Sequence, residues 1–280
     1  MQRDIIVGYD GLARSRDALA LAESLAASHD ARVVVACVYS VAPDDDQGRA
    51  EALQTAQQGR ALLARPAEAE AHAVPSWSAA PGLFDLAGER DAAALVIGSS
   101  QHGEVGRIVP GSVASRILAG APCAVGVAPV GYADRELGPL HLLGAAFDES
   151  PESERALHLA ERLTARLRGK LRIIGVAEPD TDKVEEISRQ LDEAVASAPV
   201  SVHAEGWLRH GEPAEQLAIA GKNLDLIVCG SRGYGPFRQV VLGSVSSELV
   251  TEARCPILIV PRGDPVAEPA IARPASAGRA

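Results

Sequence analysis

The strongest constraint on the fold is an internal repeat. The run DIIVGYD ends at Asp10 and the run LHLLGAAFD ends at Asp148, and a segment with Ala and Leu at helical spacing follows each of them. Asp10 and Asp148 are 138 residues apart, and so are Val38 and Val176, which lie in the next strand-like runs. A separation that recurs in this way predicts two copies of one structural unit.

The second part of each copy repeats as well. The run ALVIGSS contains Gly98, and the run LIVCGSR contains Gly230, 132 residues later. Each copy reads as five strands alternating with four helices, and the third helices are expected to open at Pro81 and Pro213. Strands and helices that alternate form a parallel sheet with helices on both faces. The predicted fold class is therefore α/β, with two tandem, doubly wound, Rossmann-like parallel five-stranded sheets.

Length and local composition predict the domain boundaries. A chain of 280 residues is long enough to bury two cores of about 130 residues each. The polar segment GYADRELG, residues 131–138, is bounded by glycines and is the expected linker, so we place the domains at residues 1–130 and 139–262. Residues 263–280 are rich in Pro and Ala without a period, and we expect them to form a disordered tail.

The charge balance argues against several classes of partner. The formal net charge is -10 and the acidic residues are scattered, so the chain has no field that attracts a nucleic acid or an anionic membrane. Residues 1–9 lead directly into a strand-like segment, and we expect no signal peptide. No apolar run approaches the roughly 18 to 20 residues that span a bilayer. We therefore expect a cytoplasmic protein.

The residues that commonly bind metals show no metal-ligand spacing. The seven histidines are scattered, and an acidic run at residues 44–46 lies on a polar segment where a solvated face explains it better than magnesium binding. The four cysteines are far apart, contain no C-x-x-C pair and lie in or beside apolar runs, which is typical of reduced core thiols. They are Cys37, Cys123, Cys229 and Cys255.

A glycine-rich segment carries the clearest chemical signal. Residues 226–250 read LIVCGSRGYGPFRQVVLGSVSSELV, in which a strand is expected to end at Gly230 and a helix to begin near Ser244. Glycines let the backbone approach a ligand closely, so that successive N–H groups can converge on a phosphate. A helix N-terminus favours an anion, and the hydroxyl of Ser244 adds a donor. Arg232 can add positive charge, although an exposed loop arginine is more often simply solvated.

Known phosphate-binding signatures help to define this loop. It contains no G-x-x-x-x-G-K-[ST] and so is not a Walker A loop, and its glycines follow the fourth strand rather than the first, unlike a dinucleotide-binding fingerprint. A glycine-rich turn before a helix can also serve only to reverse the chain. The spacing G-x-x-G-x9-G-S after the fourth strand, together with an Asp at the end of the first, resembles the universal stress protein family, and the resemblance covers nearly the whole chain twice.

The resemblance implies a fold, a ligand and a set of contacts. Members have a five-stranded parallel sheet of the adenine nucleotide α-hydrolase-like kind, and those that bind ATP use this loop for the phosphates. It implies that Asp148 contacts the ribose and Val176 the adenine, although Asp148 can equally be a helix N-cap and Val176 a core residue. The implied triphosphate contacts are Gly230, Gly233, Gly243, Ser244 and the amide of Val245.

The first copy departs from this pattern. Its loop reads GSSQHGEVGRIVPGS, which places Gln101 where the second copy has Gly233. A residue other than glycine costs about 1–2 kcal/mol in a left-handed conformation, and its side chain can fill phosphate space. We therefore predict a weaker or altered first site. Its candidate residues are Asp10, Val38, Gly98, Gly111 and Ser112.

Three classes of function follow from these expectations. The first is an ATP-binding protein, with Mg²⁺ as a possible companion ion, whose bound state regulates how it engages an unidentified protein partner in a stress response. The second is a slow ATPase, although no G-x-S-x-G elbow or Ser-His-Asp order occurs and no catalytic residue is expected. The third is a nucleotide-free interaction scaffold, a role that the first domain alone could fill.

The resemblance also implies how the two copies are joined. Related single-domain proteins pair through their last strands, which implies that AVGVAPV pairs with PILIVP inside this chain. Family analogy also implies a dimer of whole chains.

Overall fold

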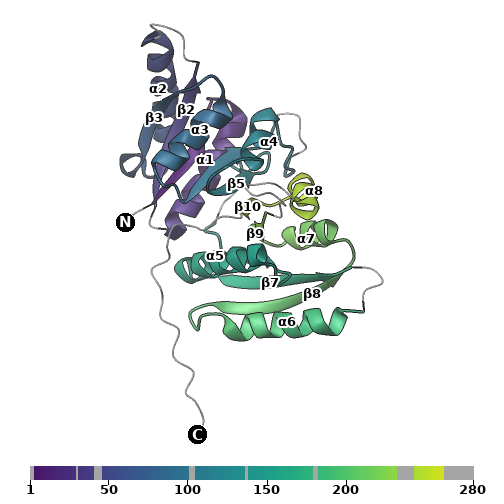
Figure 1. Ribbon diagram of the computed structural model, residues 1–280. Coiled ribbons are helices and arrows are strands. Elements are labelled where there is room, and N and C mark those ends of the chain that lie inside the picture. Colours follow the sequence, from purple (N-terminus) through teal and green to yellow (C-terminus); the bar gives the residue numbers. More distant parts are fainter. Residues whose placement is uncertain are drawn as a thin grey trace.

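The computed structural model describes residues 3–29, 31–40, 46–100, 105–135, 138–178, 182–231 and 243–261. The first half of the chain alternates strands and helices in the expected order (Figure 1). Its elements are β1 (Asp4–Gly8), α1 (Ala13–His29), β2 (Arg32–Tyr39), α2 (Asp46–Ala61), a 3-10 turn (Pro66–Glu68), β3 (Glu70–Pro75), α3 (Ala79–Glu89), β4 (Ala94–Gly98), α4 (Ser112–Leu118) and β5 (Ala124–Ala128).

The second half repeats this order. Its elements are β6 (Leu142–Ala146), α5 (Pro151–Leu167), β7 (Lys170–Ala177), α6 (Val184–Ser197), β8 (His203–His210), α7 (Pro213–Gly221), β9 (Leu226–Gly230), α8 (Ser244–Glu252) and β10 (Ile257–Val260). In the described residues each half is thus an α/β unit of five strands and four α-helices, as the repeat predicts.

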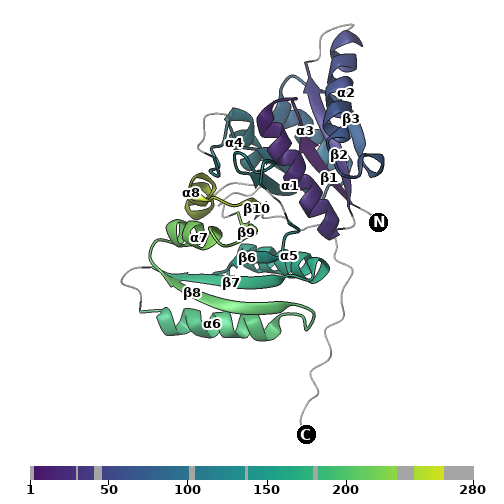
Figure 2. The same ribbon diagram turned by 180° about the vertical axis from the view of Figure 1, so that it is seen from behind.

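The two units share one sheet. Its strand order is β3-β2-β1-β4-β5-β10-β9-β6-β7-β8, and the strands within each unit are parallel. The units join where β5 and β10 pair antiparallel, with Val127 opposite Ile257 and Val125 opposite Ile259. This confirms the predicted pairing of the two last strands, and β10 lies near the middle of the molecule in both ribbon views (Figure 1, Figure 2).

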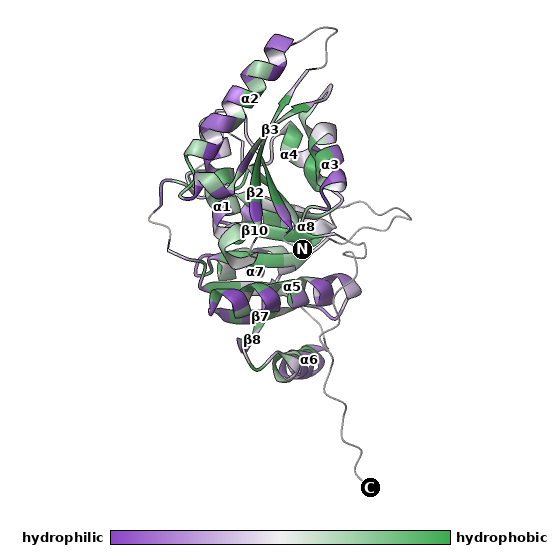
Figure 3. Cartoon of the chain, turned by 90° about the vertical axis from the view of Figure 1, so that its left-hand side faces the viewer, coloured by the Kyte–Doolittle hydropathy of each residue, from purple (hydrophilic) through white to green (hydrophobic). Residues whose placement is uncertain are grey.

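Two hydrophobic layers form because alternate residues of a strand face opposite sides of the sheet. In β1, Ile5 and Val7 pack into one layer with α1, α2, α5 and α6, whereas Ile6 packs into the other with α3, α4, α7 and α8. Hydrophobic residues concentrate on the strands and hydrophilic residues on the outer helix surfaces (Figure 3). Helices on both faces explain why the strands are almost continuously apolar. Of the described helices, none has the length and apolar character needed to span a bilayer.

Helix starts follow local sequence signals, with one difference from expectation. Ser150 is the N-cap of α5 and accepts a 3.2 Å hydrogen bond from the amide of Ser153. α7 opens at Pro213, as predicted. The prediction that α3 opens at Pro81 was wrong, because α3 begins two residues earlier, at Ala79. Proline is tolerated throughout the first helical turn, so Pro81 marks that turn without fixing its first residue.

The connection after β5 is held to the first unit by a buried carboxylate. Asp17 of α1 is 5% exposed and accepts hydrogen bonds from the amides of Gly131 (3.0 Å) and Ala133 (2.8 Å). Burial raises the pKa of Asp17 more than these hydrogen bonds lower it. The start of the predicted linker is therefore packed against α1, while residues 136–137 and the predicted tail at 263–280 lie outside the described residues.

The amino-terminal edge of the first unit carries a cluster of ion pairs. Asp4 accepts two 3.0 Å hydrogen bonds from Arg32, and Glu70 accepts hydrogen bonds from Arg90, which hold the pKa of Glu70 below its usual range. Leu142 occupies the position of Asp4 in the second unit. This edge is opposite to the carboxyl ends of the strands, so the cluster stabilises the sheet at a distance from the pockets described below.

Candidate functional site

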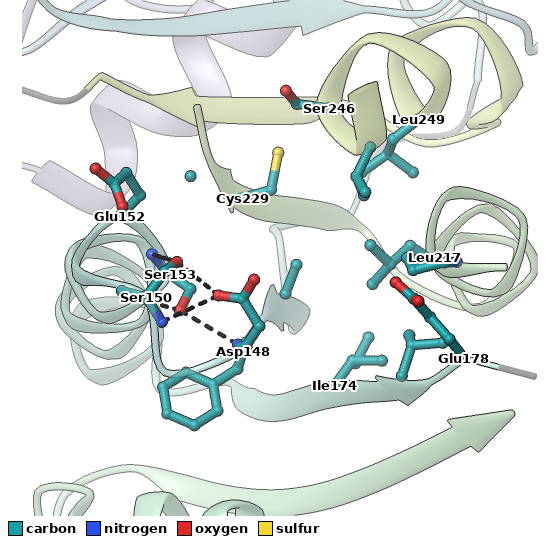
Figure 4. A pocket seen from close by; sticks show the side chains of 16 residues that line it. Asp148, Ser150, Glu152, Ser153, Ile174, Glu178, Leu217, Cys229, Ser246 and Leu249 are labelled. Atoms are coloured by element: carbon teal, nitrogen blue, oxygen red, sulfur yellow. Dashed lines mark hydrogen bonds between the residues drawn. The ribbon is translucent and has the colours of Figure 1, made fainter. Parts of the chain in front are cut away.

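A pocket of about 190 Å³ opens at the carboxyl ends of β6, β7 and β9 (Figure 4). β6 and β9 are neighbours in the sheet, and the chain winds away from them in opposite directions. In parallel α/β sheets, this reversal point is where ligands bind. The pocket is lined by Ala146, Phe147, Asp148, Ser150, Glu152, Ser153, Ile174, Val176, Glu178, Pro213, Leu217, Cys229, Gly230, Val245, Ser246 and Leu249.

Several residues selected from the sequence converge on this pocket from separate elements. One follows β6, one lies in β7, one ends β9 and one lies in the first turn of α8. They are Asp148, Val176, Gly230 and Val245.

The remaining predictions for the second half have different outcomes. Gly243 is the N-cap of α8 and Ser244 is its first residue, and the pocket wall begins at the next residue, Val245. Arg232 and Gly233 lie outside the described residues.

Asp148 does not cap the helix that follows it. Its Oδ1 atom accepts hydrogen bonds from the amide (3.1 Å) and the hydroxyl (2.5 Å) of Ser150, and the hydroxyl of Ser150 caps α5. The amide of Asp148 donates to the hydroxyl of Ser153 at 3.2 Å. The N-cap alternative for Asp148 is therefore wrong. The carboxylate instead orients the capping serine and faces the pocket (Figure 4).

Gly230 has a packing role that the sequence did not reveal. A Cβ atom at this position would lie 2.7 Å from the carbonyl carbon and 2.8 Å from the carbonyl oxygen of Glu152. Only glycine therefore lets the first turn of α5 pack against the end of β9. This role is independent of any contact with a phosphate.

The first turn of α8 borders the pocket through Val245 and Ser246. Within the described part of the chain no side chain caps this helix, and a hydrogen bond runs from the amide of Ser247 to the carbonyl of Gly243. The hydroxyl of Ser246, which lines the pocket, donates to the same carbonyl at 3.2 Å. The amides of the preceding residues are thus placed to donate to an anion, as is typical of a helix N-terminus.

Sequence reasoning missed three informative lining residues. Leu217 is four residues after Pro213, so both lie on one face of α7, and Ser246 follows Val245 in α8. Glu178 is two residues after Val176 and extends the same side of β7. The period of a strand and the period of a helix were the signals that could have found them.

The first unit has an equivalent pocket of about 230 Å³ at the carboxyl ends of β1, β2 and β4. Ala79 and Leu83 line it where Pro213 and Leu217 line the second pocket, so Ala79 rather than Pro81 is the counterpart of Pro213. Gln101 lies outside the described residues. All the candidate residues of the first half line this pocket, namely Asp10, Val38, Gly98, Gly111 and Ser112.

The two pockets differ in charge at one equivalent position. In the first, Arg14 lines the wall and its Nη2 atom lies 2.5 Å from Oδ2 of Asp10. In the second, Glu152 takes the place of Arg14 and its Oε1 atom lies 3.5 Å from Nη2 of Arg155. The carboxylate of Asp10 is therefore directly neutralised inside its pocket.

Two thiols line the pockets. Cys229 is fully buried in the second pocket, and burial raises the pKa of its thiol to about 12. Burial and the neighbouring Asp10 raise the pKa of Cys37 in the first pocket. Both thiols are protonated near neutral pH and pack as small apolar groups. Among the described residues, no group of three or more His, Cys, Asp or Glu side chains is arranged to hold a metal ion.

The asymmetry in helix capping gives a stability prediction. Leu12 precedes α1 at the position that Ser150 occupies before α5, and the amide of Ser15 lies 3.0 Å from the carbonyl of Leu12. Leu12→Ser adds a capping hydroxyl and should raise the free energy of unfolding by up to about 1 kcal/mol, whereas Ser150→Ala should lower it by about 1 kcal/mol. Urea denaturation of both variants tests this. A lower free energy of unfolding in Leu12→Ser would show that an apolar contact of Leu12 stabilises the fold more than the added cap does.

Comparison with known proteins places this geometry in context. The model of the universal stress protein family matches residues 1–129 and again residues 142–261. A universal stress protein of Mycobacterium tuberculosis H37Rv is 26% identical over 298 aligned residues, which cover 92% of this chain and 99% of the relative.

Two further comparisons agree. A universal stress protein of Thermus aquaticus is 34% identical over 129 residues, which cover 41% of this chain and 94% of the relative. The crystal structure of a universal stress protein from Archaeoglobus fulgidus DSM 4304 matches with a TM-score of 0.72 and 21% identity, and covers 93% of this chain and 98% of that one. The structural similarity therefore extends over both units.

Proposed function

The chain belongs to the universal stress protein family, and from this premise we propose that its second domain binds ATP or a related adenine nucleotide in the pocket between β6 and β9. The observation that carries the proposal is the convergence of Asp148, Val176, Gly230 and Val245 on one pocket at the reversal point of the sheet. The family pattern assigns these residues to a ribose, an adenine and a triphosphate.

The chemistry of the wall fits the parts of a nucleotide. Val176 lies with Ile174 and Leu217 in an apolar part of the pocket that suits a planar base. Asp148 offers a carboxylate to the ribose hydroxyls. The phosphates would then extend toward the amides of Ser244 and Val245 at the start of α8, with Gly243, Gly233 and Arg232 as further proposed contacts.

Two acidic residues in the pocket wall bear on whether a nucleotide fits, because a carboxylate repels a nearby triphosphate. Glu152 is paired with Arg155, which offsets its charge. Glu178 is exposed and follows the strand that carries Val176, so it belongs to the base end of the pocket. Mg²⁺ enters the proposal only as an ion carried by the phosphates, which is its usual mode of binding.

The role that we propose is regulatory. A bound nucleotide adds contacts between the end of β9 and the start of α8, and a partner protein in the cytoplasm would respond to that occupied state. The proposed first site, made by Asp10, Val38, Gly98, Gly111 and Ser112, differs in charge and in loop sequence, so the domains are not expected to respond equally. If the first domain binds no nucleotide, it acts as the scaffold of the pair.

Mass spectrometry of the purified protein tests the proposal. Protein denatured directly after purification should release an adenine nucleotide, or should retain one after incubation with ATP and removal of the excess. We expect about one tightly held equivalent per chain. Folded protein that retains no nucleotide after incubation with ATP would refute the proposal.

A phosphate-release assay on the loaded protein separates a binder from a slow ATPase. Release at the rate of unbound ATP supports the regulatory role. Release that is faster and is abolished by a substitution in the second pocket would favour the ATPase.

A further inference from the structure

Trp77 stands out because it is a large aromatic side chain that packs against almost nothing. It is 82% exposed, in the connection between β3 and α3. The other tryptophan, Trp207, is partly buried and has the guanidinium of Arg172 stacked 3.7 Å from its ring centroid. An exposed indole ring costs free energy in water, and tryptophan usually finds a partner for both its apolar face and its N–H group.

Strand register brings the backbone at Trp77 near the base end of the first pocket, just outside the residues that line it. Val38, which lines that pocket, pairs with Val74 of β3, and the amide of Ser76 continues the ladder with a 3.0 Å hydrogen bond to the carbonyl of Tyr39. Trp77 is the next residue. Trp77 is three positions after Val74 in the chain, a span of at most about 10 Å. Ala79, two residues further on, lines the pocket again.

Other exposed apolar side chains flank the same pocket. Val113 is 41% exposed and lines the pocket, and Leu12 is 44% exposed and lies between the lining residues Asp10 and Arg14. In the described part of the second half, the one large hydrophobic residue of comparable exposure is Val200, which precedes the amino end of β8 and so lies away from the pocket. Among the described residues, the first pocket therefore has more exposed apolar side chains around it than the second.

The phosphate end of the first pocket is less favourable than the base end. The sequence places Gln101 where the second loop has Gly233, and a side chain at that position can fill phosphate space. Stacking on an aromatic ring contributes about 1–3 kcal/mol per base and needs no phosphate. An exposed tryptophan beside a pocket that would hold a base suits this type of contact.

We infer that Trp77 stacks on the base of a nucleotide in the first pocket, and that this pocket selects its ligand by the nucleoside part rather than by the phosphates. The inference rests on the proposed function, because it assigns a base-binding residue to the counterpart of the second pocket. It predicts that adenosine and ATP bind the first pocket with similar affinity, within about threefold, while the second pocket strongly prefers ATP.

Tryptophan fluorescence tests the inference in the full chain. In a Trp207→Phe variant the emission comes from Trp77 alone, and adenosine should quench it with a saturable curve. Because Trp77 is exposed, Trp77→Ala should fold normally and should raise the dissociation constant of adenosine at the first pocket about tenfold, as stacking energies imply. Trp77→Phe keeps a ring and should recover most of the affinity.

The outcomes distinguish this inference from the proposed function. If calorimetry detects ATP in the second pocket while the emission of Trp77 is unaffected by adenosine and ATP, the inference is wrong and the proposed function stands. Equal adenosine affinity in Trp77→Ala and in the parent would also overturn it, and would leave the exposed ring as a contact for a protein. Loss of nucleotide from both pockets would refute both.

Discussion

Replacing Gly98 by alanine should lower the free energy of unfolding by about 3 kcal/mol, the upper end of the usual cost of overpacking. A Cβ atom at Gly98 would overlap the carbonyl oxygen of Arg14 and would lie 2.8 Å from its carbonyl carbon. These are backbone atoms in the first turn of α1, so relief requires a shift of a helix whose residues form much of the core. At Gly230 the corresponding contact with a carbonyl oxygen, that of Glu152, is longer, at 2.8 Å, and alanine there should cost about 2 kcal/mol.

Gly88 provides a matched control. It lies within α3, and a Cβ atom there would meet nothing within 4 Å. Gly88→Ala should therefore raise the free energy of unfolding by up to about 1 kcal/mol, because alanine has the higher helix propensity. Urea denaturation at one pH compares the three variants. If Gly98→Ala were as stable as the parent, the first turn of α1 would have to be free to move.

Replacing Val245 by aspartate should raise the dissociation constant of ATP at the second pocket about a hundredfold. Val245 lines the pocket in the first turn of α8, where the phosphates are proposed to lie. A carboxylate about 5 Å from a phosphate charge costs about 3 kcal/mol at an effective dielectric constant of about 20, and tenfold in affinity corresponds to about 1.4 kcal/mol. Adenosine has no phosphate and should lose less than threefold.

The design of this substitution separates binding from folding. Aspartate in the first turn of a helix interacts favourably with the macrodipole, and Val245 is only partly buried, so the thermal midpoint should change little. Val113 occupies the equivalent position in α4, and Val113→Asp should leave the second pocket unaffected. Calorimetric titration with ATP and with adenosine measures both variants. A hundredfold loss in Val113→Asp instead would place the tight site in the first unit.

Much of the architecture could be predicted because the repeat supplies each element twice. The alternation of strands and helices in each half, the parallel pairing within each half and the pairing of β5 with β10 agree with the prediction. The start of α3 was wrong by two residues, because a proline fits several positions of a first turn and the unequal connections before α3 and α7 shift the alignment of Pro81 with Pro213.

The wall of the site was harder to predict than its position. Residues at strand ends, such as Asp148 and Val176, follow from the repeat, since the carboxyl ends of parallel strands share one edge. Leu217 and Ser246 depend on which face of a helix turns toward the pocket, and that requires the exact helix start. The role of Gly230 could not be read from the sequence either, because the contact with Glu152 joins residues that are 78 positions apart.

The pairing of Asp10 with Arg14 also required the structure. Asp10 precedes α1 and Arg14 lies in its first turn. A charged side chain is common at each of these positions, so neither residue alone predicts the ion pair. Their contact, and the replacement of Arg14 by Glu152 in the second pocket, show that the repeat has preserved the shape of the two pockets more closely than their charge.

The most direct test of the central claim is a calorimetric titration of ATP into the parent chain, Val245→Asp and Val113→Asp, with folding verified for each. The account predicts a tight equivalent of ATP in the parent, its loss in Val245→Asp and its retention in Val113→Asp. Folded parent protein that binds no ATP, or a Val245→Asp variant that binds ATP as tightly as the parent, would contradict the assignment of the nucleotide to the pocket between β6 and β9.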